Sequence, residues 1–331
     1  MKTLRGTPKH LSKTGELEGF TYLMLNFPFS CNYQCLKCFN LMDNHPVTTG
    51  NPLSLEEIRR TIKEANELGA KAVVIAGEGE PTSHKNIIEI VSLIDQLEMI
   101  PIIYSNGSTL NSRFAQKYHD LNVCLVIALD SLNPQVYNML TNNKGDALSQ
   151  VLKNLENIRR VYTDTVEYKN DLKIVRLALN MTVCSRNMSE IEDIKKIAGD
   201  DIYFVCNPLA RSGNAVANWK KLVESEADFE DFQKLARKYS ESGGPLTLNS
   251  SGFCGYSLNG IGIGPFGHYM TCAYTTETNG LLGTIRDRNL QDAYKLKTNH
   301  ERKHYELHGQ IPCLVRDLSF KDFLNSLRLK E

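Results

Sequence analysis

The sequence predicts an α/β protein: a six-stranded parallel barrel, open or closed, followed by a smaller α+β extension. Three observations lead to this prediction. Predicted strands that are continuously apolar alternate with predicted helices, which is typical of a parallel sheet covered on both faces. Six such strand–helix steps follow one another without a clear domain boundary, which favours a barrel over a Rossmann sheet. After about residue 207 the alternation stops and a Gly-rich segment begins.

The elements follow from local patterns. The segment 21–29 (TYLMLNFPF) is apolar and aromatic, as expected of a first strand. Ser54 and Glu57 form the sequence signature of a capping box at the start of a helix that ends at Gly69. The further strands are expected at 72–76, 100–104, 123–129, 174–183 and 202–205, and the further helices at 87–97, 110–118, 147–161, 189–198 and 227–241.

The chain divides by composition into four segments. Residues 1–19 form an N-terminal tail, 20–210 the barrel, 211–244 a helical connector and 245–331 a small extension. Within the extension, residues 250–267 are rich in Gly and Ser with short apolar pieces, which predicts a β-hairpin region.

Composition excludes several classes of protein. The 331 residues carry 38 Lys plus Arg and 38 Asp plus Glu, so the formal net charge is zero. A balanced charge gives no indication of a nucleic-acid or membrane-surface partner. No apolar run approaches the roughly 20 residues of a membrane helix, and the N-terminus lacks the apolar core of a secretory signal. We therefore expect a cytoplasmic protein whose nine cysteines stay reduced and serve as metal ligands, catalytic thiols or core residues.

Three cysteines directly follow the first predicted strand, in the segment Cys31-Asn-Tyr-Gln-Cys35-Leu-Lys-Cys38. Three thiolates within eight residues favour a soft metal centre. A structural zinc site would need a fourth ligand, and none lies nearby in the sequence. Inert core cysteines rarely cluster in this way. A four-iron cluster held by three cysteines leaves one iron open to another ligand, which suits the pattern.

This C-x-x-x-C-x-x-C loop resembles the signature of radical S-adenosylmethionine (radical SAM) enzymes. Supporting motifs occur in the family's order: 77–81 (GEGEP) resembles its GGEP motif, 104–107 (YSNG) its Thr/Ser-Asn-Gly segment, and 129–131 (LDS) its Ser-Leu-Asp-Ser segment. The resemblance covers residues 20–210 and implies a partial (β/α)6 TIM-like barrel. It also implies a 4Fe-4S cluster on Cys31, Cys35 and Cys38 that cleaves S-adenosylmethionine to a 5′-deoxyadenosyl radical.

The resemblance also implies residues that bind S-adenosylmethionine at the ends of strands. Gly79 and Glu80 would hold the methionine ammonium, and Pro81 would shape the turn. Two positions depart from the family pattern: Lys37 stands where an aromatic residue is usual, and Glu78 replaces the first glycine of GGEP. The remaining implied positions are Phe39 for adenine packing, Ser105 and Asn106 near the ribose and the methionine carboxylate, Asp130 or Ser131 near the ribose, and Asn180 as a further cofactor contact.

A second cysteine set lies in the extension, where Cys254, Gly267 and Cys272 give C-x(12)-G-x(4)-C and Cys313 follows. This resembles the start of the SPASM and twitch extensions, which hold auxiliary Fe–S clusters. With three cysteines here, the resemblance favours a single auxiliary 4Fe-4S cluster, although purely structural thiols are the alternative. The family's closing C-x-x-C is interrupted, so the fourth ligand stays open among Cys206, His304, His308, Asp317 and substrate.

The other three cysteines lie in or beside predicted strands. Cys124 and Cys184 are expected to be buried packing residues. Cys206 ends the sixth predicted strand, where we expect it to face substrate. It could ligate the auxiliary cluster, donate a hydrogen atom to a substrate radical, or have no chemical role.

The resemblance leaves the reaction open. One hypothesis is hydrogen abstraction from a small polar substrate of the sugar, aminocyclitol or nucleoside class, giving oxidation, epimerisation or decarboxylation. A second is a maturase that epimerises or cross-links a ribosomally made peptide, and a third is a non-enzymatic Fe–S scaffold. Either enzymatic hypothesis implies an electron donor such as flavodoxin or ferredoxin.

Overall fold

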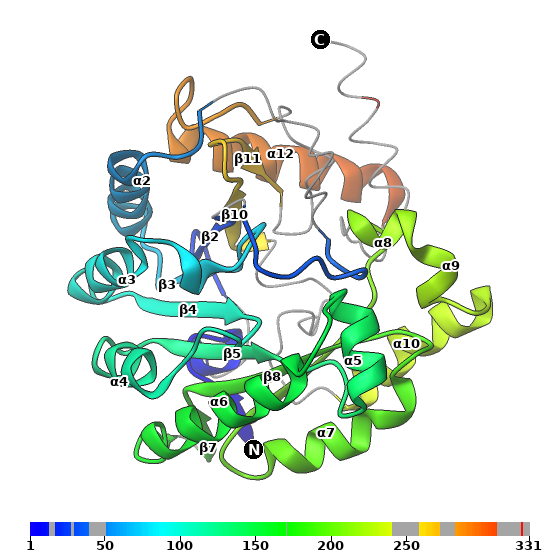
Figure 1. The fold of residues 1–331 in the computed structure, drawn as a ribbon. Helices are drawn as coiled ribbons and strands as arrows, with labels where there is room; N and C mark the ends of the chain where they lie inside the picture. Colours follow the sequence, from blue (N-terminus) through cyan, green and yellow to red (C-terminus); the bar gives the residue numbers. More distant parts are fainter. Residues whose placement is uncertain are drawn as a thin grey trace.

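The computed structural model describes residues 1–12, 17–27, 30–39, 51–169, 171–239, 258–271, 282–309 and 326. Its centre is an eight-stranded sheet in the order β11-β10-β2-β3-β4-β5-β8-β9 (Figure 1). The strands from β2 to β9 are parallel and follow the chain order, which confirms the predicted α/β fold. The bounds are β2 Tyr22–Leu25, β3 Ala72–Ile75, β4 Ile100–Ser105, β5 Cys124–Ala128, β8 Leu177–Val183 and β9 Tyr203–Pro208.

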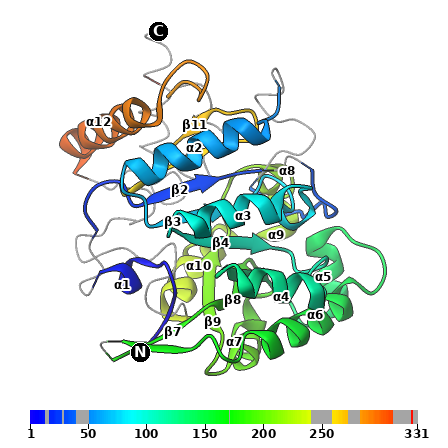
Figure 2. The same cartoon turned by 90° about the vertical axis from the view of Figure 1, so that its left-hand side faces the viewer.

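Helices cover the outer face of this sheet. Figures 1 and 2 show α2, α3 and α4 lying side by side along the outside of the strands. The predicted capping box is present: Ser54 accepts from the Glu57 N–H, and the Glu57 carboxylate accepts from the Ser54 N–H. The helix bounds are α2 Leu55–Glu67, α3 Ile87–Gln96, α4 Ser112–Asp120, α5 Pro134–Thr141, α6 Ala147–Val161, α7 Ile191–Ala198, α8 Asn214–Ala217, α9 Trp219–Leu222 and α10 Glu226–Tyr239, with 3-10 helices at Pro81–Ser83 and Met188–Glu190.

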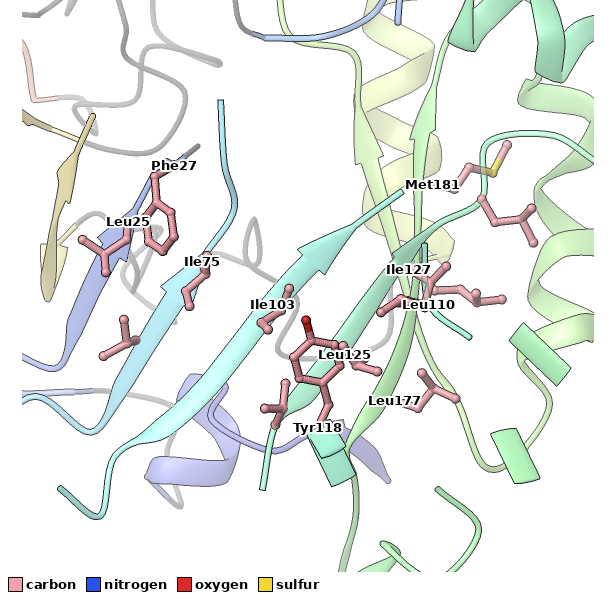
Figure 3. Close-up of a cluster of buried hydrophobic side chains, with 14 of the residues drawn as sticks. Leu25, Phe27, Ile75, Ile103, Leu110, Tyr118, Leu125, Ile127, Leu177 and Met181 are labelled. Carbon is pink, nitrogen blue, oxygen red and sulfur yellow. The ribbon is translucent and has the colours of Figure 1, made fainter. Parts of the chain in front are cut away.

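Alternate strand residues enter two separate hydrophobic cores, because successive side chains in a strand point to opposite faces. The outer core lies between the strands and the helices and includes Leu25, Ile103 and Leu125 (Figure 3). The inner core lies on the concave face and includes Met24 and Val126. This alternation decides which strand residues reach the inner side and which face the helices.

The described part of the N-terminal tail, residues 1–12 and 17–19, packs against the inner core. Strand β1 (Lys2–Leu4) pairs with β7 (Leu172–Val175), which also pairs with β6 (Glu167–Lys169) in a small separate sheet. Helix α1 (Pro8–Leu11) follows, and the Tyr22 hydroxyl donates to the Gly6 carbonyl at 2.8 Å. Leu4 contributes directly to the inner core. The tail therefore packs against the barrel instead of extending from it.

Two sequence expectations need correction. The single strand expected at 174–183 is divided at Arg176 between β7 and β8, which belong to different sheets. The Arg176 guanidinium turns inward to donate to the His119 and Val123 carbonyls. Helices α5 and α12 (Leu290–His308) stand where the sequence patterns predict no helix. Helix α5 has a local signal: Asn133 accepts from two backbone N–H groups at its start, and Pro134 occupies its first position.

The described part of the extension adds a hairpin to the barrel sheet. Strand β10 (Gly260–Ile263) pairs in parallel with β2, and β11 (Tyr269–Met270) pairs antiparallel with β10. The Arg286 guanidinium binds the Glu57 carboxylate of α2, with Nε 2.7 Å from Oε1. A hairpin is thus present where one was expected, while the four-segment division of the chain stays a prediction. Among the described residues, no helix is both long enough and apolar enough to cross a membrane.

Candidate functional site

The three clustered cysteines lie in the loop that follows β2, at the carboxyl end of the sheet, and all three are partly exposed. The loop is anchored by its backbone: the Leu36 N–H donates to the Leu140 carbonyl of α5, and the Asn214 amide donates to the Cys35 carbonyl. The Cys38 N–H donates to the Cys35 carbonyl at 3.2 Å, which closes a tight turn between two of the thiols. The protein therefore holds the thiols on one structured loop.

Two of these thiols lie where burial raises their pKa. Burial raises the pKa of Cys31 to about 11, and burial also raises the pKa of Cys35. A cysteine binds a metal as its thiolate, so metal binding is coupled to the release of thiol protons. Among the described residues, no group of three or more His, Cys, Asp or Glu side chains converges on one point as a single-ion site would require. Three thiolates on three different irons of a cubane need not converge, so this soft donor set fits an Fe–S cluster better than a single zinc ion.

Glu80 is the centre of a buried hydrogen-bond network beside this loop, and its side chain is 2% exposed. Its Oε1 accepts from the Ser105 hydroxyl at 2.8 Å and from the Thr82 N–H at 3.1 Å. Its Oε2 accepts from the Asn106 N–H at 2.7 Å. Burial raises the pKa of Glu80, while these donors oppose that shift. A carboxylate oxygen can accept two hydrogen bonds, so Oε2 can receive one more donor such as an ammonium.

Asn106 connects this network to the cysteine loop. Its amide nitrogen donates to the Asn32 side-chain oxygen at 2.9 Å and lies 3.9 Å from the Cys31 sulfur. Its side-chain oxygen accepts from the Ser108 N–H and hydroxyl. The structure therefore brings together Cys31, Glu80, Ser105 and Asn106, which the sequence had assigned to one site. Asn32 was missed because it occupies a variable position of the C-x-x-x-C-x-x-C motif, and Ser108 because it lies just beyond the 104–107 segment.

The turn that carries Glu80 depends on a glycine. Gly77 has a φ of +64°, and a Cβ there would lie 2.7 Å from the Gly79 carbonyl and 3.0 Å from the Pro81 ring. Glu78, which departs from the family pattern, is 1% exposed, and its Oε1 lies 3.6 Å from the Cβ position of Gly264 in the hairpin. The departure thus places a buried carboxylate between the GEP turn and the extension.

Lys37, the second departure, forms a buried ion pair with Asp130. The Lys37 ammonium lies 2.9 Å from Asp130 Oδ2, and the two side chains are 11% and 3% exposed. Burial alone would lower the pKa of Lys37, but Asp130 and Cys35 raise it on balance. Asp130 Oδ1 accepts from the Thr182 N–H at 2.9 Å. Asp130, which the resemblance associates with the ribose, therefore contacts the cysteine loop in this structure.

Ser131 and Asn180 make other contacts. Ser131 is fully buried, and its hydroxyl donates to the Glu190 carboxylate at 2.7 Å. Asn180 accepts from the Asn207 amide at 2.6 Å. Asn180 and Asn207 share the alternation of the inner-core residues Ala178 and Val205, so this amide pair lies on the inner side. The side-chain oxygen of Asn207 is buried and has no hydrogen-bond partner among the described residues.

Cys206 faces away from this site. It is 1% exposed and belongs to the outer core, whereas its neighbours Val205 and Asn207 point inward. The expectation that Cys206 faces substrate is therefore wrong, because the strand alternation directs its thiol toward the helices. Cys124 and Cys184 are both fully buried, as the sequence predicts for packing residues.

The remaining predicted residues receive less structural information. Phe39 is partly buried next to the cysteine loop, and its contact with adenine stays a prediction. Cys254, Cys272 and Cys313 lie outside the described residues, as does Asp317. His304 is fully buried in α12, 4.6 Å from the ring of His308 by centroid distance.

Comparison with known proteins identifies the domain. Residues 25–171, which contain the cysteine loop, the Glu80 network and Asp130, match the model of the radical SAM superfamily. The chain carries a radical SAM domain. Enzymes of this superfamily use a 4Fe-4S cluster and S-adenosylmethionine, and the thiol loop and the open acceptor of Glu80 fit both groups.

Curated relatives give further context. A probable GTP 3′,8-cyclase of Thermococcus kodakarensis is 32% identical over 54% of this chain and 53% of its own length. The chain thus spans about half the length of the first curated relatives it matches. A GTP 3′,8-cyclase of Alkaliphilus metalliredigens is 28% identical over 90% of this chain and 96% of its own length.

A solved structure with a similar fold covers most of the chain. Streptococcus suis SuiB, bound to its precursor peptide SuiA, aligns with a TM-score of 0.60 at 14% identity, over 86% of this chain and 67% of that one. At this identity the likeness concerns the fold alone. It agrees with a mostly parallel sheet that forms a partial barrel.

Proposed function

We propose that this protein is a radical SAM enzyme whose cluster is held by Cys31, Cys35 and Cys38. The observation that carries the proposal is the network that joins Cys31, Asn106 and Glu80 at one end of the sheet. When bound there, a 4Fe-4S cluster with S-adenosylmethionine supplies the electron that generates a 5′-deoxyadenosyl radical. The network is consistent with a cofactor that needs thiolate ligands and a carboxylate in the same place.

The residues of the chain have separate tasks in this proposal. Glu80 receives the methionine ammonium on Oε2, while Ser105 and Thr82 hold Oε1 and fix the orientation of the carboxylate. Asn106 donates its backbone N–H to Glu80 and its side-chain amide to Asn32 of the cysteine loop. These two hydrogen bonds fix the position of the thiols relative to the ammonium site. These groups are fixed before the cofactor binds, which limits reorganisation during the reaction.

We assign the substrate to the nucleoside class. Two observations support this assignment: curated relatives named GTP 3′,8-cyclase match the chain, one of them over 90% of it, and the inner face carries the buried Asn180–Asn207 amide pair. The amide oxygen of Asn207 can accept from an N–H or O–H of a base or ribose. A polar substrate with many donors, such as a nucleotide, satisfies this acceptor.

A peptide substrate is the second candidate. It is supported by the similarity in fold to SuiB, which was solved with its precursor peptide. The two candidates differ in the molecule that loses a hydrogen atom to the 5′-deoxyadenosyl radical. It is a nucleotide in the first case and a gene-encoded peptide in the second.

Deuterium transfer distinguishes these candidates. The anaerobic, iron-loaded protein is incubated with S-adenosylmethionine, dithionite and ribose-deuterated GTP or another nucleoside triphosphate. The nucleoside assignment predicts deuterium in 5′-deoxyadenosine, and Asn207→Ala should reduce this transfer while cofactor binding persists. If no nucleotide transfers deuterium and a peptide encoded beside the gene does, the peptide candidate replaces the nucleoside assignment.

We further propose that Cys254, Cys272 and Cys313 hold an auxiliary 4Fe-4S cluster. Iron analysis tests this proposal directly, because two four-iron clusters give about eight irons per chain and one gives about four. The triple variant Cys254→Ala/Cys272→Ala/Cys313→Ala should then lose about half of the iron. If the wild-type protein and the triple variant both contain about four irons per chain, these cysteines do not hold a cluster.

A further inference from the structure

Besides its backbone anchors to Leu140 and Asn214, the cysteine loop makes two side-chain attachments to the barrel, and these use different chemistry. At its first half, Asn106 and Ser108 of the segment after β4 contact Asn32 through neutral hydrogen bonds. At its second half, Lys37 reaches the buried carboxylate of Asp130 after β5. Lys37 lies between Cys35 and Cys38, so its contact with Asp130 acts on the turn that carries both thiols.

Asp130 is itself rigidly held. Its Oδ1 accepts from the Thr182 N–H of β8 at 2.9 Å, and its backbone carbonyl accepts from the Asn187 amide at 2.7 Å. Asn187 is fully buried and also donates to the Thr182 carbonyl at 2.9 Å. The Lys37 ammonium adds a weaker contact to the Thr182 hydroxyl at 3.4 Å. The ion pair therefore connects the loop to the ends of two central strands.

The pair also places a positive charge beside the thiols. Lys37 and Asp130 are mostly shielded from water, so their charges act through a medium of lower dielectric constant than solvent. A cation next to an Fe–S cluster favours the reduced state, which carries one more negative charge. Charged groups outside the ligand set are known to adjust both the affinity and the potential of metal sites.

We propose that Lys37 is a positioning residue that fastens the Cys35–Cys38 turn to Asp130 and raises the reduction potential of the cluster. This inference rests on the proposed function, because it requires the cluster on Cys31, Cys35 and Cys38. Lys37 has two separable effects: it holds the loop mechanically through Asp130, and it stabilises added negative charge.

Four variants separate these effects: Lys37→Met, Lys37→Arg, Asp130→Asn and the double variant Lys37→Met/Asp130→Leu. The exposed Lys85→Met serves as the matched control. Two quantities are measured without substrate: the midpoint potential of the cluster in a dithionite titration followed by EPR, and the rate of iron release to a chelator. The signal that changes when S-adenosylmethionine is added identifies this cluster and distinguishes it from any auxiliary cluster.

We expect Lys37→Met to lower the potential and Asp130→Asn to raise it, because the two substitutions remove opposite charges. Iron release should accelerate about tenfold or more in both, since each breaks the same link. Lys37→Arg keeps the positive charge, so its midpoint potential should stay near that of the wild-type protein. The double variant removes both charges without leaving an unpaired one, so it should fold, retain a potential near that of wild type and still release iron quickly.

The outcomes separate this inference from the proposed function. If the wild-type protein has no EPR signal that responds to S-adenosylmethionine, both fail. If the wild-type protein has that signal and Lys37→Met matches Lys85→Met in potential and iron release, the role of Lys37 alone is wrong. Slow iron release from the double variant would overturn the mechanical link.

Discussion

The hydroxyl of Ser105 lies 2.8 Å from Oε1 of Glu80, although 25 positions separate the two residues in the chain. Glu80 follows β3 and Ser105 ends β4, and these neighbouring parallel strands pair in register from Ala72 with Ile100 to Ile75 with Ile103. The carboxyl ends of parallel strands meet at one edge, so two motifs that are distant in sequence form a single network. This contact orients the carboxylate to which we assign cofactor binding.

Replacing Glu80 with Gln should weaken S-adenosylmethionine binding. The substitution removes the negative charge that pairs with the methionine ammonium, and a hydrogen bond to a charged group contributes about 1.5–3 kcal/mol. We therefore expect a Kd at least about tenfold higher, measured by titrating the cofactor against the EPR signal of the reduced cluster. The matched control is Glu67→Gln, an exposed residue at the end of α2. Equal affinities for both variants would contradict the assignment of Glu80.

Substituting Gly77 with Ala should destabilise the turn before Glu80. An added Cβ would clash with the Gly79 carbonyl at 2.7 Å while the backbone keeps a φ of +64°. We expect a loss of about 2–3 kcal/mol in the free energy of unfolding, measured in urea. Gly19→Ala is the matched control, since its φ is +68° and no atom lies within 4 Å of its Cβ position. That variant should lose only about 1 kcal/mol, from backbone strain alone. Similar losses in the two variants would show that the close approach at Gly77 is unimportant.

The pair Glu57–Arg286 should make stability depend on acid pH. The hydrogen bond from Arg286 is the largest cause that lowers the pKa of Glu57, from 4.5 to about 2. A carboxylate with a lowered pKa stabilises the fold above its unfolded pKa, and this contribution disappears as the pH falls from about 4.5 to about 2. Because both side chains are partly exposed, we expect about 1 kcal/mol.

Unfolding measured across this pH range tests the pair. Glu57→Gln should be less stable than wild type at pH 7, and the difference should vanish toward pH 2. The adjacent, exposed Glu56→Gln is the control and should behave like wild type. A Glu57→Gln deficit that stays constant down to pH 2 would contradict this account, because it would not depend on the charge of Glu57.

Much of the barrel follows from local sequence. Apolar runs such as 72–76 form buried strands whatever their partners, and Ser54 with Glu57 marks the helix start because both residues act within one turn. The three cysteines and Glu80 are recognisable because each lies in a short motif directly after a strand. Strand β1 was missed because three residues carry little periodicity, and its pairing with β7 spans about half of the chain.

Orientation and long-range partners could not be predicted in the same way. Cys206 and Asn207 are neighbours, and a shift of one position in register would exchange which of them faces inward. The Lys37–Asp130 pair joins a loop to the end of a strand that is three strands away in the sheet. Neither residue alone carries a local signal for the other. Tertiary packing therefore determines these details of the site.

The most direct test of the central claim is 5′-deoxyadenosine formation in the anaerobic, iron-loaded protein with S-adenosylmethionine and dithionite. The wild-type protein should form 5′-deoxyadenosine and methionine, and Cys31→Ala should form neither, because its cluster lacks a ligand. The control is Cys124→Ala, which removes a fully buried thiol on the inner core and should keep the activity. Continued 5′-deoxyadenosine formation by Cys31→Ala, or none by the iron-loaded wild-type protein, would contradict the assignment of this loop as the catalytic cluster site.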